Sequence, residues 1–179
     1  MNLLDAIFNQ ESLDRVAVLF EQQRISYSEL RDQTLGMMQA LRFLEVERQD
    51  RVALLLNDSP EFVALFIAIV SHGAIAVPIN MGLRPDEQRA ILNDSTARVT
   101  IVEAERADSL LRDEKLPTLR DIVVVSRDKE KDFTTETQNT QSKHRDDVQS
   151  ALPKKTWWLD ELLTKSASQA LPSFPTPAA

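Results

Sequence analysis

The sequence predicts an α/β fold in which a mostly parallel sheet is flanked by helices and preceded by an N-terminal β-hairpin. Short apolar runs of strand length alternate with segments that have the period of a helix. From residue 51 onwards, strands and helices follow one another in turn, which is typical of a parallel sheet with helices on both faces. Two of the helical segments also begin with recognisable capping residues.

The hairpin and the first helix are predicted within residues 14–44. Apolar side chains alternate along 14–21, and 24–27 has the pattern of a returning strand, so the two segments are expected to pair antiparallel. Ser26 and Glu29 have the spacing of a capping box, in which each side chain satisfies a backbone N–H at the helix start. One apolar stripe then follows, formed by Leu30, Thr34, Met37, Leu41 and Leu44.

A buried strand and a well-capped helix come next. Residues 51–56 are apolar almost without interruption, as in a strand that is covered on both faces. Ser59 and Pro60 mark a helix start. The helix at 60–72 is apolar nearly all round, so we expect it to be deeply buried, and Gly73 is expected to end it in a left-handed conformation.

Three more strands and two shorter helices complete the expected sheet. The strands are predicted at 74–78, 98–102 and 121–125, the last two because they are rich in β-branched residues. The helices are predicted at 85–93, where a proline opens the segment, and at 107–113.

Composition divides the chain into four parts. Residues 1–126 are expected to form one α/β subdomain. Residues 127–155 are rich in polar and charged residues, and we expect a mobile surface loop because such a segment buries too little apolar surface to order itself. A short helix is predicted at 156–165 from its apolar pattern. Residues 166–179 are rich in Ser, Ala and Pro and resemble a linker-like tail.

The charge and the residue usage exclude several classes of partner. The formal net charge is −7 and the basic residues are dispersed, so nucleic acid is not expected as a partner. No apolar run is long enough to predict a membrane span. The chain has no cysteine, and its first ten residues contain no Lys or Arg, unlike the basic front of a secretory signal. We therefore expect a cytoplasmic location.

The sequence contains no pattern of catalytic residues that we can assign. It has no G-x-S-x-G, G-x-x-x-x-G-K-[ST] or G-x-G-x-x-G motif, and His72 and His144 are too far apart to predict a metal site. In a parallel sheet, ligands bind where loops leave the carboxyl ends of the strands, here Asn57-Asp58, 80–82, 103–106 and the residues after Val125. The simpler alternative is that Asn57 and Asp58 only end a strand and cap a helix.

Five motifs in order carry a resemblance to a known family. They lie at residues 25–30 (ISYSEL), 50–62 (DRVALLLNDSPEF), 68–80 (AIVSHGAIAVPIN), 85–87 (PDE) and 91–98 (ILNDSTAR). Together they resemble the N-terminal segment of the adenylate-forming (AMP-binding) superfamily, which includes acyl- and aryl-CoA synthetases. The resemblance covers about the first 125 residues. Where that family usually has glycines, this chain has Glu45 and Gln49, so we expect a different backbone in the turn before Asp50.

The resemblance implies an ATP-dependent carboxylate–CoA ligase that uses Mg-ATP, CoA and a small carboxylic acid. The family's phosphate loop ending in P-K-G, its adenine- and ribose-binding motifs and its catalytic lysine are absent from this sequence. We therefore expect an N-terminal portion of such a ligase that is inactive alone and holds no cofactor by itself. Its expected partners are the remainder of the ligase or a second copy, because a partial sheet exposes an apolar edge.

The family resemblance also suggests residues on the CoA side of the site. In some CoA-forming members the loops after two consecutive strands touch the CoA nucleotide, and the matching positions here are Asn80, Met81, Gly82 and Arg106. The alternative is that Gly82 only shapes a turn and Arg106 is a solvated side chain. Two other functions stay open: a non-catalytic interaction or self-association module with the same fold, and a small enzyme whose site we do not recognise.

Overall fold

The computed structural model describes residues 3–8, 13–111, 116–126 and 154–168. Within them lie a two-stranded antiparallel hairpin, β1-β2, and a five-stranded parallel sheet in the order β4-β3-β5-β6-β7. The elements are α1 (Leu3–Phe8), β1 (Val16–Phe20), β2 (Gln23–Ser26), α2 (Tyr27–Phe43), β3 (Arg51–Leu55), α3 (Pro60–His72), β4 (Ile75–Pro78), α4 (Pro85–Ser95), β5 (Val99–Glu103), α5 (Ala104–Leu111), β6 (Asp121–Val125), β7 (Lys155–Trp158) and α7 (Leu159–Ser168).

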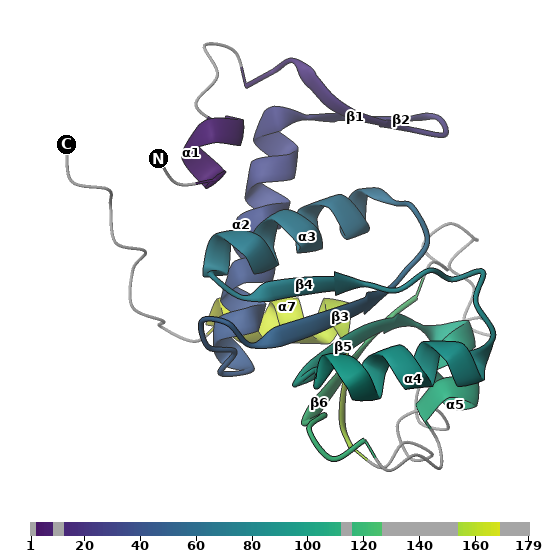
Figure 1. Ribbon diagram of the computed structural model, residues 1–179. Coiled ribbons are helices and arrows are strands. Elements are labelled where there is room, and N and C mark those ends of the chain that lie inside the picture. The colour runs from purple at the N-terminus through teal and green to yellow at the C-terminus, as the bar shows by residue number, and fades with distance from the viewer. Residues whose placement is uncertain (1–2, 9–12, 112–115, 127–153, 169–179) are drawn as a thin grey trace, which may run out of the picture.

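The parallel sheet has helices on both faces, which confirms the expected α/β architecture (Figure 1). Helices α2, α3 and α7 pack on one face, and α4 and α5 on the other. Strand β3 contributes to both cores, with Val52 and Leu54 on the first face and Ala53 and Leu55 on the second. All four side chains are 0% exposed, as the unbroken apolar run predicts.

Helix α2 begins and packs as its sequence predicts. The Glu29 backbone N–H donates to Ser26 Oγ at 3.2 Å, and the Ser26 backbone N–H donates to Glu29 Oε2 at 2.8 Å, which completes the capping box. The bond from the Ser26 backbone, followed by the bond from its hydroxyl, lowers the pKa of the Glu29 carboxyl below its ordinary value. The expected apolar stripe of α2 is buried in the first core: Leu30, Thr34, Met37, Leu41 and Leu44.

Helix α3 has the expected ends but is not buried all round. Ser59 Oγ accepts a hydrogen bond from the Phe62 backbone N–H at 3.1 Å, and Gly73 ends the helix with φ of 88°. Phe66 and Val70, however, are each 39% exposed, so the expectation of deep burial is wrong for this face. The reason is that α3 lies in the outer layer of the described residues and covers the sheet with its other side (Figure 1).

The turn before β3 has a left-handed backbone at two residues that are not glycine. Glu45 has φ of 52° and Gln49 has φ of 67°, which is the left-handed region that favours glycine. Hydrogen bonds hold the turn in place: the Val46 backbone N–H donates to Leu41 O at 3.0 Å, and the Gln49 N–H donates to Gly73 O at 2.8 Å. The tertiary structure therefore imposes a conformation that ordinary side chains disfavour.

The C-terminal part differs from the predicted helix at 156–165. Residues Lys155–Trp158 form the strand β7 alongside β6, and the helix begins only at Leu159. Pairing with β6 explains the difference, because a neighbouring strand offers hydrogen bonds that the apolar pattern does not reveal. The Trp157 side chain adds to this pairing, since its indole N–H donates to Asp121 Oδ1 at 3.1 Å.

The other expectations divide into confirmed elements, one unexpected element and two segments that stay untested. The strands and helices expected between residues 14 and 125 are present, with bounds that differ by a few residues; α5, for example, begins at Ala104 and not at residue 107. Helix α1 was not expected from the sequence. Of the expected polar loop at 127–155, residues 127–153 lie outside the described residues, and Lys155 belongs to β7. Of the expected tail at 166–179, residues 169–179 lie outside them, and 166–168 belong to α7.

Replacing Gln49 by glycine is expected to stabilise the protein. A left-handed backbone costs an ordinary residue about 1–2 kcal/mol, and glycine loses about 0.5–1 kcal/mol in chain entropy, so the free energy of unfolding should rise by about 0.5–1 kcal/mol. Urea denaturation of Gln49→Gly measures the change. The matched control Gln39→Gly, inside α2, is expected to lower the same quantity by about 1 kcal/mol. A fall in stability for Gln49→Gly would contradict the interpretation.

Candidate functional site

The connections of the sheet reverse direction between β3 and β5. Strand β3 leads through α3 to β4 on one side, whereas β5 leads through α5 to β6 on the other side. Because α3 and α5 lie on opposite faces, the chain leaves these neighbouring strands in opposite directions. Such a point opens a crevice at the carboxyl ends of the strands, which is where open α/β sheets bind ligands.

Two side chains close this crevice. The backbone N–H of Asn57, just after β3, donates to Glu103 Oε1 at 2.9 Å, and the Asn57 Nδ2 amide donates to Glu103 Oε2 at 2.8 Å. Glu103 is the last residue of β5 and only 5% exposed. Both carboxylate oxygens thus accept a hydrogen bond across the crevice, so this pair has a structural role, and a ligand would need to bind elsewhere along the edge.

The turn after β4 contains three of the residues expected on the CoA side. Asn80 Oδ1 accepts a hydrogen bond from the Gly82 backbone N–H at 2.7 Å, and Asn80 O accepts one from the Leu83 N–H at 3.3 Å. Asn80 thus shapes the turn with both its side chain and its backbone. A Cβ atom at Gly82 would lie 3.2 Å from Asn80 Oδ1, which leaves little room for a larger residue. Met81 packs against the second core and anchors the turn.

Arg106, the fourth expected residue, reaches this turn from α5. Its Nη2 donates to Met81 O at 3.3 Å, and its side chain is half-buried. The structure therefore brings together all four residues that the sequence suggested, from two segments that are 25 residues apart. The remaining guanidinium N–H groups of Arg106 have no acceptor within the described part of the chain, so they are available to an anion.

Sequence reasoning missed one residue of this region, Gln88 on α4. Gln88 is 0% exposed, and its Nε2 donates to Asn80 O at 3.0 Å. Its Oε1 is buried and has no hydrogen-bond partner among the described residues. A glutamine within the polar-looking helix Pro85–Ser95 gives no signal of burial, so only the structure could identify it.

Three arginines at the opposite, amino edge of the sheet have structural roles. Arg51 donates through Nε to Ser95 O at 3.1 Å, and Arg98 Nη1 lies 3.0 Å from Asp50 Oδ2. The third is Arg120, which donates to Leu44 O, at the end of α2, and to two carboxylates. Its hydrogen bond to Asp121, at 2.7 Å, is the main reason that the pKa of the Arg120 guanidinium is raised, with a smaller contribution from Glu45. These groups bind carbonyls at helix ends and carboxylates of the chain itself.

His72 has a structural role at the end of α3. Its Nε2 lies 2.7 Å from Val46 O, so the ring fastens the end of α3 to the turn before β3. His144, the other histidine, lies outside the described residues. Across residues 3–8, 13–111, 116–126 and 154–168, no group of three or more His, Asp or Glu side chains is arranged to hold a metal ion.

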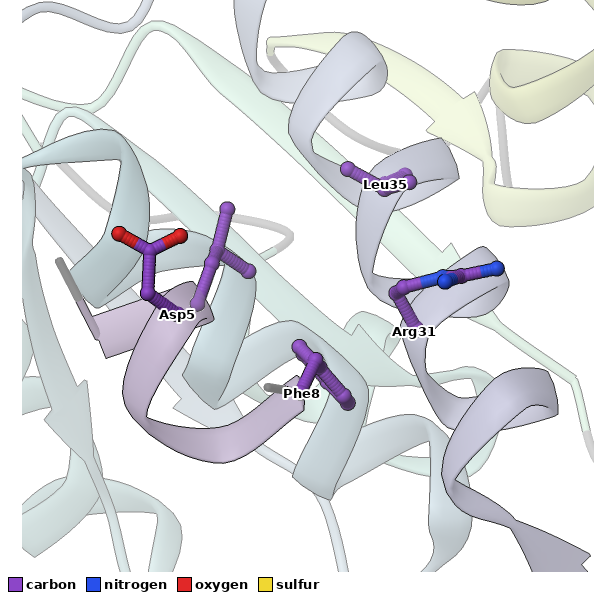
Figure 2. A pocket seen from close by; sticks show the side chains of 5 residues that line it. Asp5, Phe8, Arg31 and Leu35 are labelled. Atoms are coloured by element: carbon purple, nitrogen blue, oxygen red, sulfur yellow. The ribbon is translucent and has the colours of Figure 1, made fainter. Parts of the chain in front are cut away.

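An open groove of about 410 Å³ lies between α1 and α2 (Figure 2). It is lined by Leu4, Asp5, Phe8, Arg31 and Leu35. Helix α1, which forms one wall of the groove, lies across the molecule from the connection between β4 and α4 (Figure 1). Its lining contains neither a nucleophile beside a base nor a pair of carboxylates, so it offers no chemistry of its own.

None of the helices that the structure describes is both long and apolar enough to cross a bilayer.

Comparison with known proteins identifies the family. The family model described as "AMP-binding enzyme" matches residues 5–169, which is most of the chain. The chain belongs to the AMP-binding enzyme family. This finding confirms the resemblance that the five motifs indicated.

Curated relatives of the chain include several CoA ligases. It is 34% identical over 119 residues to a 4-hydroxybenzoate–CoA/benzoate–CoA ligase of Rhodopseudomonas palustris, a match that covers 62% of this chain and 21% of that protein. It is 33% identical over 111 residues to a 3-hydroxybenzoate–CoA ligase of an Aromatoleum species, covering 60% and 21%. The chain thus spans about a fifth of the length of these relatives.

Solved structures support the same family. An anthranilate CoA ligase in complex with anthranoyl-AMP matches with a TM-score of 0.60 and 32% identity, covering 69% of this chain and 25% of that one. The adenylation domain of a carboxylate reductase from Mycobacterium chelonae matches with a TM-score of 0.71 over 99% of this chain and 30% of that one. At 21% identity, the second match supports the fold alone.

The Asn57–Glu103 pair is expected to stabilise the fold measurably. Hydrogen bonds to a buried carboxylate contribute about 1.5–3 kcal/mol, so Asn57→Ala and Glu103→Gln should each lower the free energy of unfolding by about 1–3 kcal/mol. Because the two residues contact each other, the double variant should lose at least about 1 kcal/mol less than the sum of the single losses. Urea denaturation of the four proteins measures this coupling. Strictly additive losses would show that the pair does not act as a unit.

Proposed function

We propose that this chain is the N-terminal scaffold of an ATP-dependent carboxylate–CoA ligase and that its turn at Asn80–Gly82, with Arg106, faces CoA. The complete ligase would join a small carboxylic acid to AMP and then transfer the acyl group to CoA. Membership of the AMP-binding family and relatives that are CoA ligases support the reaction class. The cytoplasm is the proposed compartment.

One contact carries the assignment of the CoA side. The bond from Arg106 Nη2 to Met81 O joins the turn after β4 to the first turn of α5 at the carboxyl edge of the sheet. This contact fixes the direction of the guanidinium while leaving other N–H groups available. CoA carries a 3′-phosphate and a pyrophosphate, and an oriented guanidinium is well suited to bind either group.

The residues of this chain fit CoA better than they fit ATP. The exposed turn at Asn80–Gly82 and the half-buried Arg106 provide a glycine-containing turn beside one guanidinium, which can bind an anion. A phosphate loop ending in P-K-G is absent from the sequence. The proposal therefore assigns ATP and Mg²⁺ to residues of the ligase other than these, and this chain supplies orientation and one wall of the site.

Binding of adenosine 3′,5′-bisphosphate, the nucleotide part of CoA, tests this assignment. Calorimetric titration should detect binding, and Arg106→Ala should weaken it about tenfold, as expected for the loss of one charge-assisted hydrogen bond. Arg89→Ala is the matched control, because Arg89 Nη1 donates to Ser109 O of α5 at 3.1 Å, and it should change the affinity less than about twofold.

Two results would contradict the proposal. Equal affinity of the wild type and of Arg106→Ala for adenosine 3′,5′-bisphosphate would show that Arg106 does not contact the nucleotide. ATP–pyrophosphate exchange catalysed by this chain alone would show that the groups that handle ATP are present here after all. The chain would then be a catalyst by itself and not only a scaffold.

A second candidate function, self-association, is favoured by the exposed face of α3. Phe66 and Val70 lie one helical turn apart on this face, each 39% exposed, and Phe62 stacks on Phe66 with ring centroids 6.3 Å apart. Strand β4 is also an edge of the five-stranded sheet, and its Ile75 is 47% exposed. Exposed apolar side chains beside an open strand edge are typical of a surface that a partner covers.

Sedimentation velocity across a range of concentrations tests this candidate. If two copies associate through α3, the weight-average mass should rise with concentration, and the variant Phe66→Ser/Val70→Ser should stay monomeric. Ile91→Ser removes an exposed apolar side chain from α4 on the opposite face and should leave the association unchanged. A wild-type protein that is monomeric throughout would eliminate self-association as a function.

A further inference from the structure

Gln88 occupies an unusual position beside the candidate site. It lies on α4, one turn before Leu92, and no part of its side chain is exposed. Its Nε2 donates to Asn80 O at 3.0 Å, across eight residues of chain. Its Oε1 is buried without a hydrogen-bond partner among the residues that the structure describes.

The orientation of this amide follows from its neighbour. Asn80 O is an acceptor, so the nitrogen of the Gln88 amide must face it, and the oxygen is directed away. A buried acceptor without a partner destabilises a protein, and an apolar side chain of similar volume at this position would avoid that loss. Stability alone therefore does not explain why a glutamine is present here.

Helix α4 has other residues at its start and in its core, although Gln88 is itself one of its buried residues. The Arg84 backbone N–H donates to Glu87 Oε2 at 2.9 Å at the helix start, and Leu92 anchors the helix in the second core. What Gln88 adds is a bond to the turn after β4, where Asn80 also bonds Gly82 and Leu83. The Gln88 amide therefore acts on the conformation of the turn after β4.

We propose that Gln88 is a positioning residue that holds the Asn80–Gly82 turn in the conformation that, with Arg106, receives the CoA nucleotide. The amide fixes Asn80 O, Asn80 fixes the Gly82 N–H through its own side chain, and Met81 presents its carbonyl to Arg106. This inference rests on the proposed function, because it assigns a task to a neighbour of the same site. The unpaired Oε1 lowers the stability of the protein, and the same amide keeps the turn fixed.

The variant Gln88→Met separates positioning from stability. Methionine has nearly the same length and volume, removes the unpaired oxygen and cannot bond Asn80 O. The thermal midpoint of the full chain is expected to stay equal or rise, while the affinity for adenosine 3′,5′-bisphosphate falls about fivefold or more, the scale of one lost hydrogen bond. Amide hydrogen exchange at Gly82 and Leu83 is expected to become faster, because the turn loses its anchor.

Leu92→Met is the matched control for a change in a buried side chain of α4. Leu92 is 2% exposed and belongs to the second core, and its replacement touches no bond to the turn. The control should leave both the exchange at Gly82 and the affinity for the nucleotide unchanged, within about twofold.

The outcomes distinguish this inference from the proposed function. A Gln88→Met protein that binds the nucleotide like the wild type, or that loses stability and affinity together, would overturn the positioning role. A wild-type protein that does not bind the nucleotide would overturn the proposed CoA side. In that case the exchange rates still decide whether Gln88 holds the turn, and unchanged rates would overturn that role as well.

Discussion

The structure depends on the burial of β3 between β4 and β5. Val52 and Leu54 pack against one layer of helices, and Ala53 and Leu55 pack against the other, so a polar residue at any of these positions would face an apolar core. Because β3 leads to β4 on one side and β5 leads to β6 on the other, the same strand also sets where the chain reverses direction. The positions of α3 and α5 on opposite faces, and hence the crevice between β3 and β5, follow from this arrangement.

The polar groups at the amino ends of the strands differ from those at the carboxyl ends in how many of their hydrogen bonds are already made. At the amino edge, Arg51 and Arg120 donate to carbonyls where helices end, and Arg98 bonds Asp50, so each has partners within the protein. At the carboxyl edge, Asn57 and Glu103 satisfy each other, whereas the candidate site keeps guanidinium N–H groups without an acceptor in the described residues. Groups that are already satisfied stabilise the fold, and groups with unused donors are the ones that can bind a ligand.

Most of the fold could be predicted from local patterns, and the failures have physical causes. The bounds of α3 and β6 agree with the sequence because a Ser-Pro start, a glycine end and a β-branched run are local signals. Strand β7 was missed because it depends on pairing with β6, which the residues of β7 do not reveal by themselves. The left-handed conformation of Gln49 was missed because a hydrogen bond to Gly73 imposes it. In the site, motifs suggested Arg106 and the turn, but no local pattern reveals Gln88 or the Asn57–Glu103 pair, whose members lie 46 residues apart.

The exposed face of α3 and the candidate site belong to different sides of the sheet. Phe66 and Val70 lie on the helix layer of the first core, whereas α4, α5 and the turn at Asn80–Gly82 belong to the second. A partner that covers α3 would therefore leave the turn and Arg106 accessible, whether that partner is another part of a ligase or a second copy. Covering α3 would bury apolar surface without using any of the polar groups proposed to face CoA, so the proposed association and the proposed nucleotide binding are expected to be separable.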